Sequence, residues 1–138
     1  MSWRYQNVLV EEIPEKAKSF VYRITNLQTG RAYIGFKLFY FAKFKYIKGK
    51  RKRVYEESDW RTYWSSSEEV KSDVLKLGLS NFNREILYFC PNKAVGKYLE
   101  LKEQMDNRVL ERPDLFYNSI VNARINRNHI KEFVKSGN

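Results

Sequence analysis

The sequence predicts an α+β fold, with a small, mainly antiparallel central sheet flanked by helices and a basic insertion after the second strand. Three observations support this prediction. Residues 20–25 alternate in the way that a strand with one buried face requires. Serines followed by glutamates at residues 65–69 mark the start of a helix. Apolar residues take up helical spacing after residue 93, so strands and helices are mixed in the order that an α+β domain shows.

Length and composition favour one compact domain. The chain has 138 residues, of which 43% are hydrophobic, and this suffices for a single core. We expect one domain over residues 1–138, with a core at about 18–120, a basic insertion at about 37–58 and a basic C-terminal tail at about 121–138. Because no run of about 18 apolar residues and no signal-peptide pattern occur, we expect no membrane partner and a cytoplasmic location.

Residue counts restrict the chemistry. Cys90 is the only cysteine and His129 the only histidine, which excludes intramolecular disulfides, zinc clusters built on Cys and His, and any Cys–His or Ser–His catalysis that needs those residues together. Any metal must therefore be held by oxygen, which points to Mg²⁺ or Mn²⁺. We expect no small-molecule organic cofactor.

The charge balance points to a polyanionic partner. The chain carries 26 Lys and Arg against 16 Asp and Glu, a formal charge of +10, and 16% of its residues are aromatic. Phosphate attraction supplies affinity for nucleic acids and planar rings supply stacking, so this composition is common in nucleic-acid-binding domains. The alternative is a basic protein with a solvated surface.

The first two strands form a predicted hairpin. Residues 26–30 carry turn-forming side chains, and a second short strand with Tyr33 follows. If the loop has two or four residues, Tyr22 and Tyr33 project from the same face of the hairpin.

A dense basic stretch follows this hairpin. Seven of the eleven residues from 43 to 53 are Lys or Arg, which is too much like charge to bury. The stretch is either a surface loop or an extended ribbon that turns at Gly49, and aromatic residues beside the charges favour contact with nucleic acid over a merely flexible loop. The candidate contacts are Lys43, Lys45, Lys48, Lys50, Arg51, Lys52, Arg53 and, further on, Arg61.

The second half of the chain predicts two helices and a strand. The first helix starts at the serine and glutamate cluster and ends at Gly78, and residues 82–89 then read as a core strand. A second helix should run from residue 93 to about 110, with an apolar stripe of Ala94, Tyr98, Leu101 and Met105. Glu100 borders that stripe, where a carboxylate can face a cleft, although Lys97 and Lys102 also make an ordinary ion pair an open alternative.

Taken together, these segments resemble the GIY-YIG nuclease domain, in particular its small phage-type members. The resemblance rests on VYRITN followed by AYIG, with Tyr33 eleven positions after Tyr22, on YWSSSEEVKSDVLKLG, on NFNREIL, on the helix with Glu100, and on the YN pair at Tyr117 and Asn118. Each fragment is weak alone, but the order of all five makes the combination specific.

The resemblance implies a metal-dependent endonuclease that hydrolyses DNA phosphodiester bonds. It assigns Tyr22 and Tyr33 to the catalytic site, Glu100 to the divalent metal ion, and Asn118 to a supporting amide. Such a reaction needs an activated water and charge neutralisation at the phosphate. We expect that a tyrosine near a cation and a metal ion can lose or share its proton below the ordinary pKa of about 10.

The sequence also departs from the family pattern. Phe20 and Val21 replace the glycine and isoleucine of the first motif, and the usual arginine after YIG has no clear counterpart. Tyr63 is our candidate for the histidine or tyrosine that follows that arginine. Lys37 is our preferred cation; the other candidates are Lys43 by position and Arg51, Arg53 and Arg61 by charge.

Other functions stay open at this stage. If no cation reaches the phosphate, the chain could be a catalytically silent DNA-binding or assembly protein on the same scaffold. An RNA-binding module is a third hypothesis, for which no RNA motif is present. No separate recognition domain is visible, so a protein partner is one route to targeting.

Overall fold

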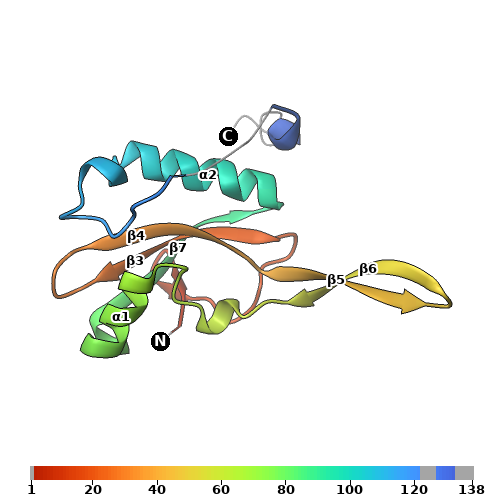
Figure 1. Cartoon of the computed structure of the whole chain (residues 1–138), viewed down its shortest axis with the longest axis horizontal. Helices are drawn as coiled ribbons and strands as arrows, with labels where there is room; N and C mark the ends of the chain where they lie inside the picture. Colours follow the sequence, from red (N-terminus) through yellow and green to blue (C-terminus); the bar gives the residue numbers. More distant parts are fainter. Residues whose placement is uncertain (1, 122–126, 133–138) are drawn as a thin grey trace.

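The computed structural model describes residues 2–121 and 127–132. A mixed five-stranded sheet lies at the centre, in the order β2-β1-β7-β3-β4, and a separate two-stranded ribbon, β5–β6, projects from one end of it (Figure 1). The α+β prediction is confirmed, and within the described residues all strand pairs are antiparallel except β1 with β7. The strands are β1 (Arg4–Tyr5), β2 (Val8–Leu9), β3 (Ser19–Asn26), β4 (Ala32–Leu38), β5 (Tyr40–Ile47), β6 (Lys50–Glu57) and β7 (Phe82–Cys90).

The helices are α1 (Glu68–Leu77) and α2 (Lys93–Asp106), with short 3₁₀ turns η1 (Trp60–Thr62), η2 (Leu79–Asn81), η3 (Val109–Glu111) and η4 (Arg127–Ile130). Among the described residues, none of the helices has the length and hydrophobicity needed to cross a membrane. The predicted basic tail is described only at residues 121 and 127–132, and its remaining positions lie outside the described residues.

The hairpin of β3 and β4 has the predicted geometry. Tyr22 pairs with Gly35 and Ile24 with Tyr33, so the two tyrosines share one face. The side-chain carbonyl of Asn26 accepts hydrogen bonds from two backbone N–H groups of the turn, and Gly30 takes a φ of +78° that glycine tolerates. The turn chemistry therefore sets the register on which the shared face depends.

The cap of α1 confirms the predicted helix start and end. The Ser67 hydroxyl accepts a hydrogen bond from the Val70 backbone N–H at 3.2 Å, and Gly78 ends the helix with a φ of +90°. Val70 and Val74 face the sheet.

The predicted apolar stripe of α2 is only partly correct, because Tyr98 packs against the core but the most deeply buried positions are others. Val95 and Leu99 are the buried apolar residues, whereas Met105 is 60% exposed. Gln104 is also buried, because its amide donates a hydrogen bond to the Ile34 carbonyl. A buried glutamine is not counted as apolar, so the search for hydrophobic spacing placed the buried face incorrectly.

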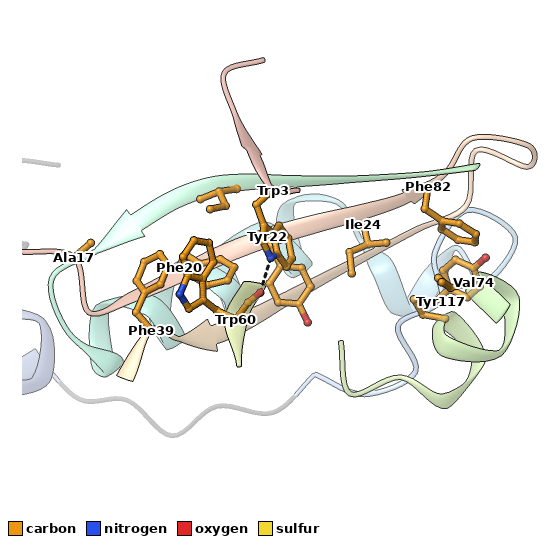
Figure 2. Packing of buried hydrophobic residues seen from close by; sticks show 12 residues of the cluster. Trp3, Ala17, Phe20, Tyr22, Ile24, Phe39, Trp60, Val74, Phe82 and Tyr117 are labelled. Carbon is orange, nitrogen blue, oxygen red and sulfur yellow. Dashed lines mark hydrogen bonds between the residues drawn. The ribbon is translucent and has the colours of Figure 1, made fainter. Parts of the chain in front are cut away.

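The two helices cover opposite faces of the sheet (Figure 1). Val70 and Val74 of α1 pack with Phe20, Tyr22 and Ile24, while α2 packs on the face that carries the intervening β3 residues. The α1 face also holds an aromatic cluster in which the Trp3 indole donates a hydrogen bond to the Trp60 carbonyl at 2.7 Å (Figure 2). This cluster surrounds Tyr22 and fixes its ring.

Candidate active site

Three tyrosines meet on the α1 face of the sheet. Tyr22 lies on β3 and Tyr33 on β4, and Tyr63 directly follows η1. The ring centroids of Tyr22 and Tyr33 are 6.2 Å apart, and those of Tyr22 and Tyr63 are 6.0 Å apart. Tyr22 is almost completely buried, while the other two rings are half-buried. The structure thus brings the three predicted tyrosines together, with Tyr33 and Tyr63 nearer the surface.

Gly35 makes this close packing possible. A Cβ atom at this position would lie 2.6 Å from Tyr22 Cζ and 2.8 Å from Tyr33 Cε1, well inside the normal contact distance. The glycine of the YIG motif is therefore needed for space, because both rings cross the backbone at the point where a side chain would begin.

Glu100 faces the same region from α2. Its side chain is 15% exposed and lies 3.7 Å from Lys97 Nζ. A cavity of about 530 Å³ opens beside β4, the edge strand of the sheet, and its wall includes Tyr33, Ser66 and Glu100. The predicted metal ligand and one predicted tyrosine therefore line one cavity.

The protonation tendencies of the tyrosines differ from our expectation. Burial, followed by the neighbouring phenols and Glu100, raises the pKa of Tyr22 well above its ordinary value. Burial also raises the pKa of Tyr33 and of Tyr63. The expected lowering of a tyrosine pKa is thus not produced by the surrounding protein groups, and at neutral pH these phenols carry their protons.

Burial likewise raises the pKa of Glu100, and the ammonium of Lys97 opposes that shift. A cation bound close to a partly buried carboxylate of this kind stabilises its charged form.

Asn118 acts on the backbone of β4. Its side-chain carbonyl accepts a hydrogen bond from the Ile34 N–H at 3.0 Å, and its amide donates to the Ile34 carbonyl at 2.8 Å. The side chain thereby imitates a neighbouring strand at the sheet edge. Because Ile34 lies between Tyr33 and Gly35, this pairing holds the backbone that carries the site.

Lys37 is the cation candidate that lies against Tyr63. It sits on β4 with a buried side chain, its Nζ lies 4.0 Å from the centre of the Tyr63 ring, and it forms an ion pair with Asp59 Oδ1 at 2.6 Å. The Lys37 ammonium lowers the pKa of Asp59, mainly through their hydrogen bond. Lys37 belongs to β4 and precedes the ribbon, although we expected the insertion to begin at about this residue.

The other cation candidates lie elsewhere. Lys43, Arg51 and Arg53 are on the ribbon, where Lys43 forms an ion pair with Glu56 at 2.7 Å. Arg61 donates hydrogen bonds to the Glu57 carboxylate and to the Glu11 carbonyl.

A model of a known protein family matches most of the chain. Residues 3–121 match a family model described as "Putative endonuclease segE, GIY-YIG domain". The chain belongs to the GIY-YIG family. Comparison with curated protein sequences and with solved structures gives no match.

Within this GIY-YIG domain, sequence analysis missed Arg84. Its guanidinium is stacked between two indoles, 4.6 Å from the Trp3 ring centre and 4.4 Å from that of Trp64. It donates hydrogen bonds to the carbonyls of Tyr63 at 2.8 Å and Arg61 at 3.1 Å, and burial lowers its pKa to about 10. Arg84 thus holds the segment that presents Tyr63.

A signal for Arg84 was present in the sequence. Position 84 has the same parity in β7 as the buried Phe82 and Ile86, so a charged residue was placed on a buried face. Such residues are rarely buried without a specific partner.

The residues present can hold a hard divalent ion only if water and substrate supply most of its ligands. Within residues 2–121 and 127–132, no group of three or more His, Cys, Asp or Glu side chains could form a metal cage. Mg²⁺ usually keeps several waters and binds one or two carboxylates together with substrate phosphates. Glu100 on the wall of a cavity fits that arrangement, and the GIY-YIG domain would then share its ion with water and substrate.

Proposed function

We propose that this chain is an endonuclease that uses Mg²⁺ or Mn²⁺ to hydrolyse phosphodiester bonds in DNA, in a phage or another mobile element. The observation that carries the proposal is a GIY-YIG domain in which Tyr33 and Glu100 line one cavity. Tyr22 packs against Tyr33 and Tyr63, and Lys37 lies against the Tyr63 ring. This set combines a carboxylate, a cation and several hydroxyl groups, which are the groups that phosphodiester hydrolysis needs.

Glu100 is the proposed metal ligand. A bound divalent ion would neutralise charge on the phosphoryl oxygens and stabilise the leaving oxygen. The helix α2 holds the Glu100 carboxylate at the cavity wall, and Gln104 lies 3.4 Å from one of its oxygens. Orientation of the water and contact with the phosphate are then the proposed roles of other side chains.

The tyrosines act as proton-bearing groups. Because their pKa values are raised, they donate hydrogen bonds at neutral pH. Tyr33 lines the cavity and shares a hydrogen bond with Ser66 at 3.3 Å, so we propose that it orients the attacking water. Tyr22, which is buried behind it, holds Tyr33 and Tyr63 in position.

Lys37 is the proposed phosphate contact. Asp59, its present partner, has a side chain that is 60% exposed, so it can turn into solvent when a phosphate takes its place. The ammonium would then stay against the Tyr63 ring and neutralise charge that develops on a phosphoryl oxygen.

A cleavage assay tests the proposal. We expect supercoiled plasmid DNA to be nicked or linearised by the wild type with Mg²⁺, and Glu100→Gln to lose this activity. Asp106→Asn is the matched control, because Asp106 lies on the same helix but forms an exposed ion pair with Lys102. Equal cleavage by the wild type and Glu100→Gln would refute the assigned metal ligand.

A second candidate function is a silent DNA-binding or assembly protein. It is favoured by the ion pair that already occupies Lys37 and by the lack, among the described residues, of a group of three or more His, Cys, Asp or Glu side chains that could hold a metal ion. DNA binding without cleavage under any divalent metal would support it. Both functions are consistent with a cytoplasmic location and with a protein partner that directs the chain to its target.

A further inference from the structure

The ribbon β5–β6 has two chemically different faces. Residues of β5 and β6 that pair directly share a face, so the register divides the ribbon into two sets. The first set pairs Phe44 with Arg53 and Tyr46 with Arg51, and we call it the arginine face. The second pairs Lys45 with Lys52 and Ile47 with Lys50, and we call it the lysine face.

The arginine face is exposed and pre-organised. The Arg51 guanidinium lies 3.9 Å from the centre of the Phe44 ring, and that of Arg53 lies 5.5 Å from the Tyr55 ring. Phe44, Tyr46 and Tyr55 are 56%, 79% and 62% exposed, so these rings serve no core of the isolated chain. An exposed set of aromatic rings that hold guanidinium groups in place is typical of a binding surface.

On the lysine face, ion pairs relieve the repulsion between like charges only near the base of the ribbon. Lys45 and Lys52 stand directly opposite one another, and like charges in that position destabilise a strand pair. Glu56 forms ion pairs with Lys43 at 2.7 Å and Lys45 at 3.8 Å, near the base of the ribbon. Towards the tip, no ion pair of Lys50 or Lys52 exists among the described residues. A polyanion would therefore relieve the repulsion.

The dimensions of the ribbon fit the major groove of DNA better than the minor groove. Eight residues in each strand give a length of about 26 Å at 3.3 Å per residue. The major groove of B-form DNA, about 12 Å wide, admits a two-stranded ribbon, whereas the minor groove is about 6 Å wide. The ribbon also projects away from the central sheet, so it can enter a groove without moving the core (Figure 1).

We propose that the ribbon enters the major groove of duplex DNA with its arginine face towards the bases. Arg51 and Arg53 contact guanine edges, because a guanidinium can donate two hydrogen bonds to guanine O6 and N7 while an ammonium acts as a point charge. The lysine side chains extend to the phosphates at the groove rim. The inference rests on the proposed DNA substrate and adds that this small chain selects its own sites.

Binding assays without metal test the two faces separately. A random pool of DNA duplexes is first enriched on the wild type in EDTA, and affinity for the enriched duplexes is then compared with affinity for the starting pool. In Arg51→Lys/Arg53→Lys, which keeps the charge, we expect the preference for enriched duplexes to fall by about 5- to 150-fold for each lost guanine contact. Methylation of guanine N7 should weaken wild-type binding and leave that variant unaffected.

The matched variant is Lys45→Gln/Lys52→Gln. It should weaken binding to all duplexes alike and lower the slope of log affinity against log salt by about 2, while the preference for enriched duplexes stays. Thermal unfolding of either variant should not fall below that of the wild type, because the four substituted side chains lie outside the core.

Several results would overturn the inference. These are the lack of any enrichment, insensitivity to N7 methylation, or an unchanged preference in Arg51→Lys/Arg53→Lys. Stronger binding to RNA of the same sequence would also overturn it. Failure of the nuclease proposal is separable: site-selective binding without cleavage in Mg²⁺ would leave the ribbon inference standing, and cleavage without selective binding would remove only the ribbon inference.

Discussion

Replacement of Gly35 by alanine should damage the site and the fold together. The new Cβ would lie 2.6 Å from Tyr22 Cζ and 2.8 Å from Tyr33 Cε1. Tyr22 cannot move aside easily, because Trp3 and Tyr63 pack against its ring at centroid distances of 5.2 Å and 6.0 Å. Overpacking of this kind costs about 1–3 kcal/mol, and rigid surroundings favour the upper end.

The net effect on stability can be worked out from this cost. Alanine also restricts the unfolded chain, which stabilises the fold by about 0.4–1 kcal/mol. Subtracted from an overpacking cost of about 3 kcal/mol, this leaves a fall of about 2 kcal/mol in the unfolding free energy. An unfolding entropy of about 2.1 cal/mol/K per residue over 138 residues gives about 0.29 kcal/mol/K, and the Tm should therefore fall by about 7 °C. Calorimetry measures this shift, and plasmid cleavage at 20 °C, below the transition, should fall with it.

Gly96→Ala is the matched control. A Cβ there would meet Ser19 Oγ at 2.6 Å and Phe36 Cδ2 at 2.8 Å, but on the α2 side of the sheet. It should also destabilise the fold, by less because alanine favours the helix by about 1 kcal/mol, and it should leave cleavage per folded molecule unchanged. A Gly35→Ala protein that melts and cleaves like the wild type would refute the packing argument, as would an equal loss of cleavage in Gly96→Ala.

Three further substitutions test other parts of the site. Burial raises the pKa of Glu100 in the folded chain above its value in the unfolded chain, so the wild type loses stability as the pH rises from the unfolded value through the folded one. The stability of Glu100→Gln relative to wild type should therefore rise between pH 4 and pH 7 in urea titrations, and a constant difference would contradict this. Arg84→Met should lower the unfolding free energy by about 1–3 kcal/mol, because the Tyr63 carbonyl loses its donor. In absorbance titrations the raised pKa of Tyr63 should return towards 10, and an unchanged pKa would mean that Arg84 does not position Tyr63. Asn118→Asp should destabilise the chain by about 1–3 kcal/mol at pH 7, since a carboxylate would face the Ile34 carbonyl. At pH 3 the loss of stability should be smaller, because the protonated acid can donate a hydrogen bond to that carbonyl. Equal losses at both pH values would exclude the proposed pairing.

The parts of the site that sequence could predict are those set by short-range periodicity. Alternation in β3 and turn chemistry at residues 26–30 fix the pairing register, and with it the shared face of Tyr22 and Tyr33. The serine cap and Gly78 act on backbone groups within one helical turn, so the bounds of α1 were predictable as well.

The parts that failed depend on polar residues with distant partners. Arg84 and Gln104 are buried because they bond carbonyls of Tyr63 and Ile34, which lie 21 and 70 positions away in the chain. A hydropathy pattern treats both side chains as solvent-facing, and it therefore missed one positioning residue and misplaced the buried face of α2. The raised tyrosine pKa values have a similar origin, since burial by several segments acts on each phenol.

The sequence by itself determined the α+β class, the pair of tyrosines on one hairpin face, the excess of positive charge and the resemblance to the GIY-YIG family. Only the tertiary structure decided which of the five cation candidates stands beside Tyr63, and how Glu100 comes to share a cavity with Tyr33. The physical reason is that strand parity and helix caps are local, whereas a catalytic site is assembled by packing between segments that the chain order leaves free to meet in many ways.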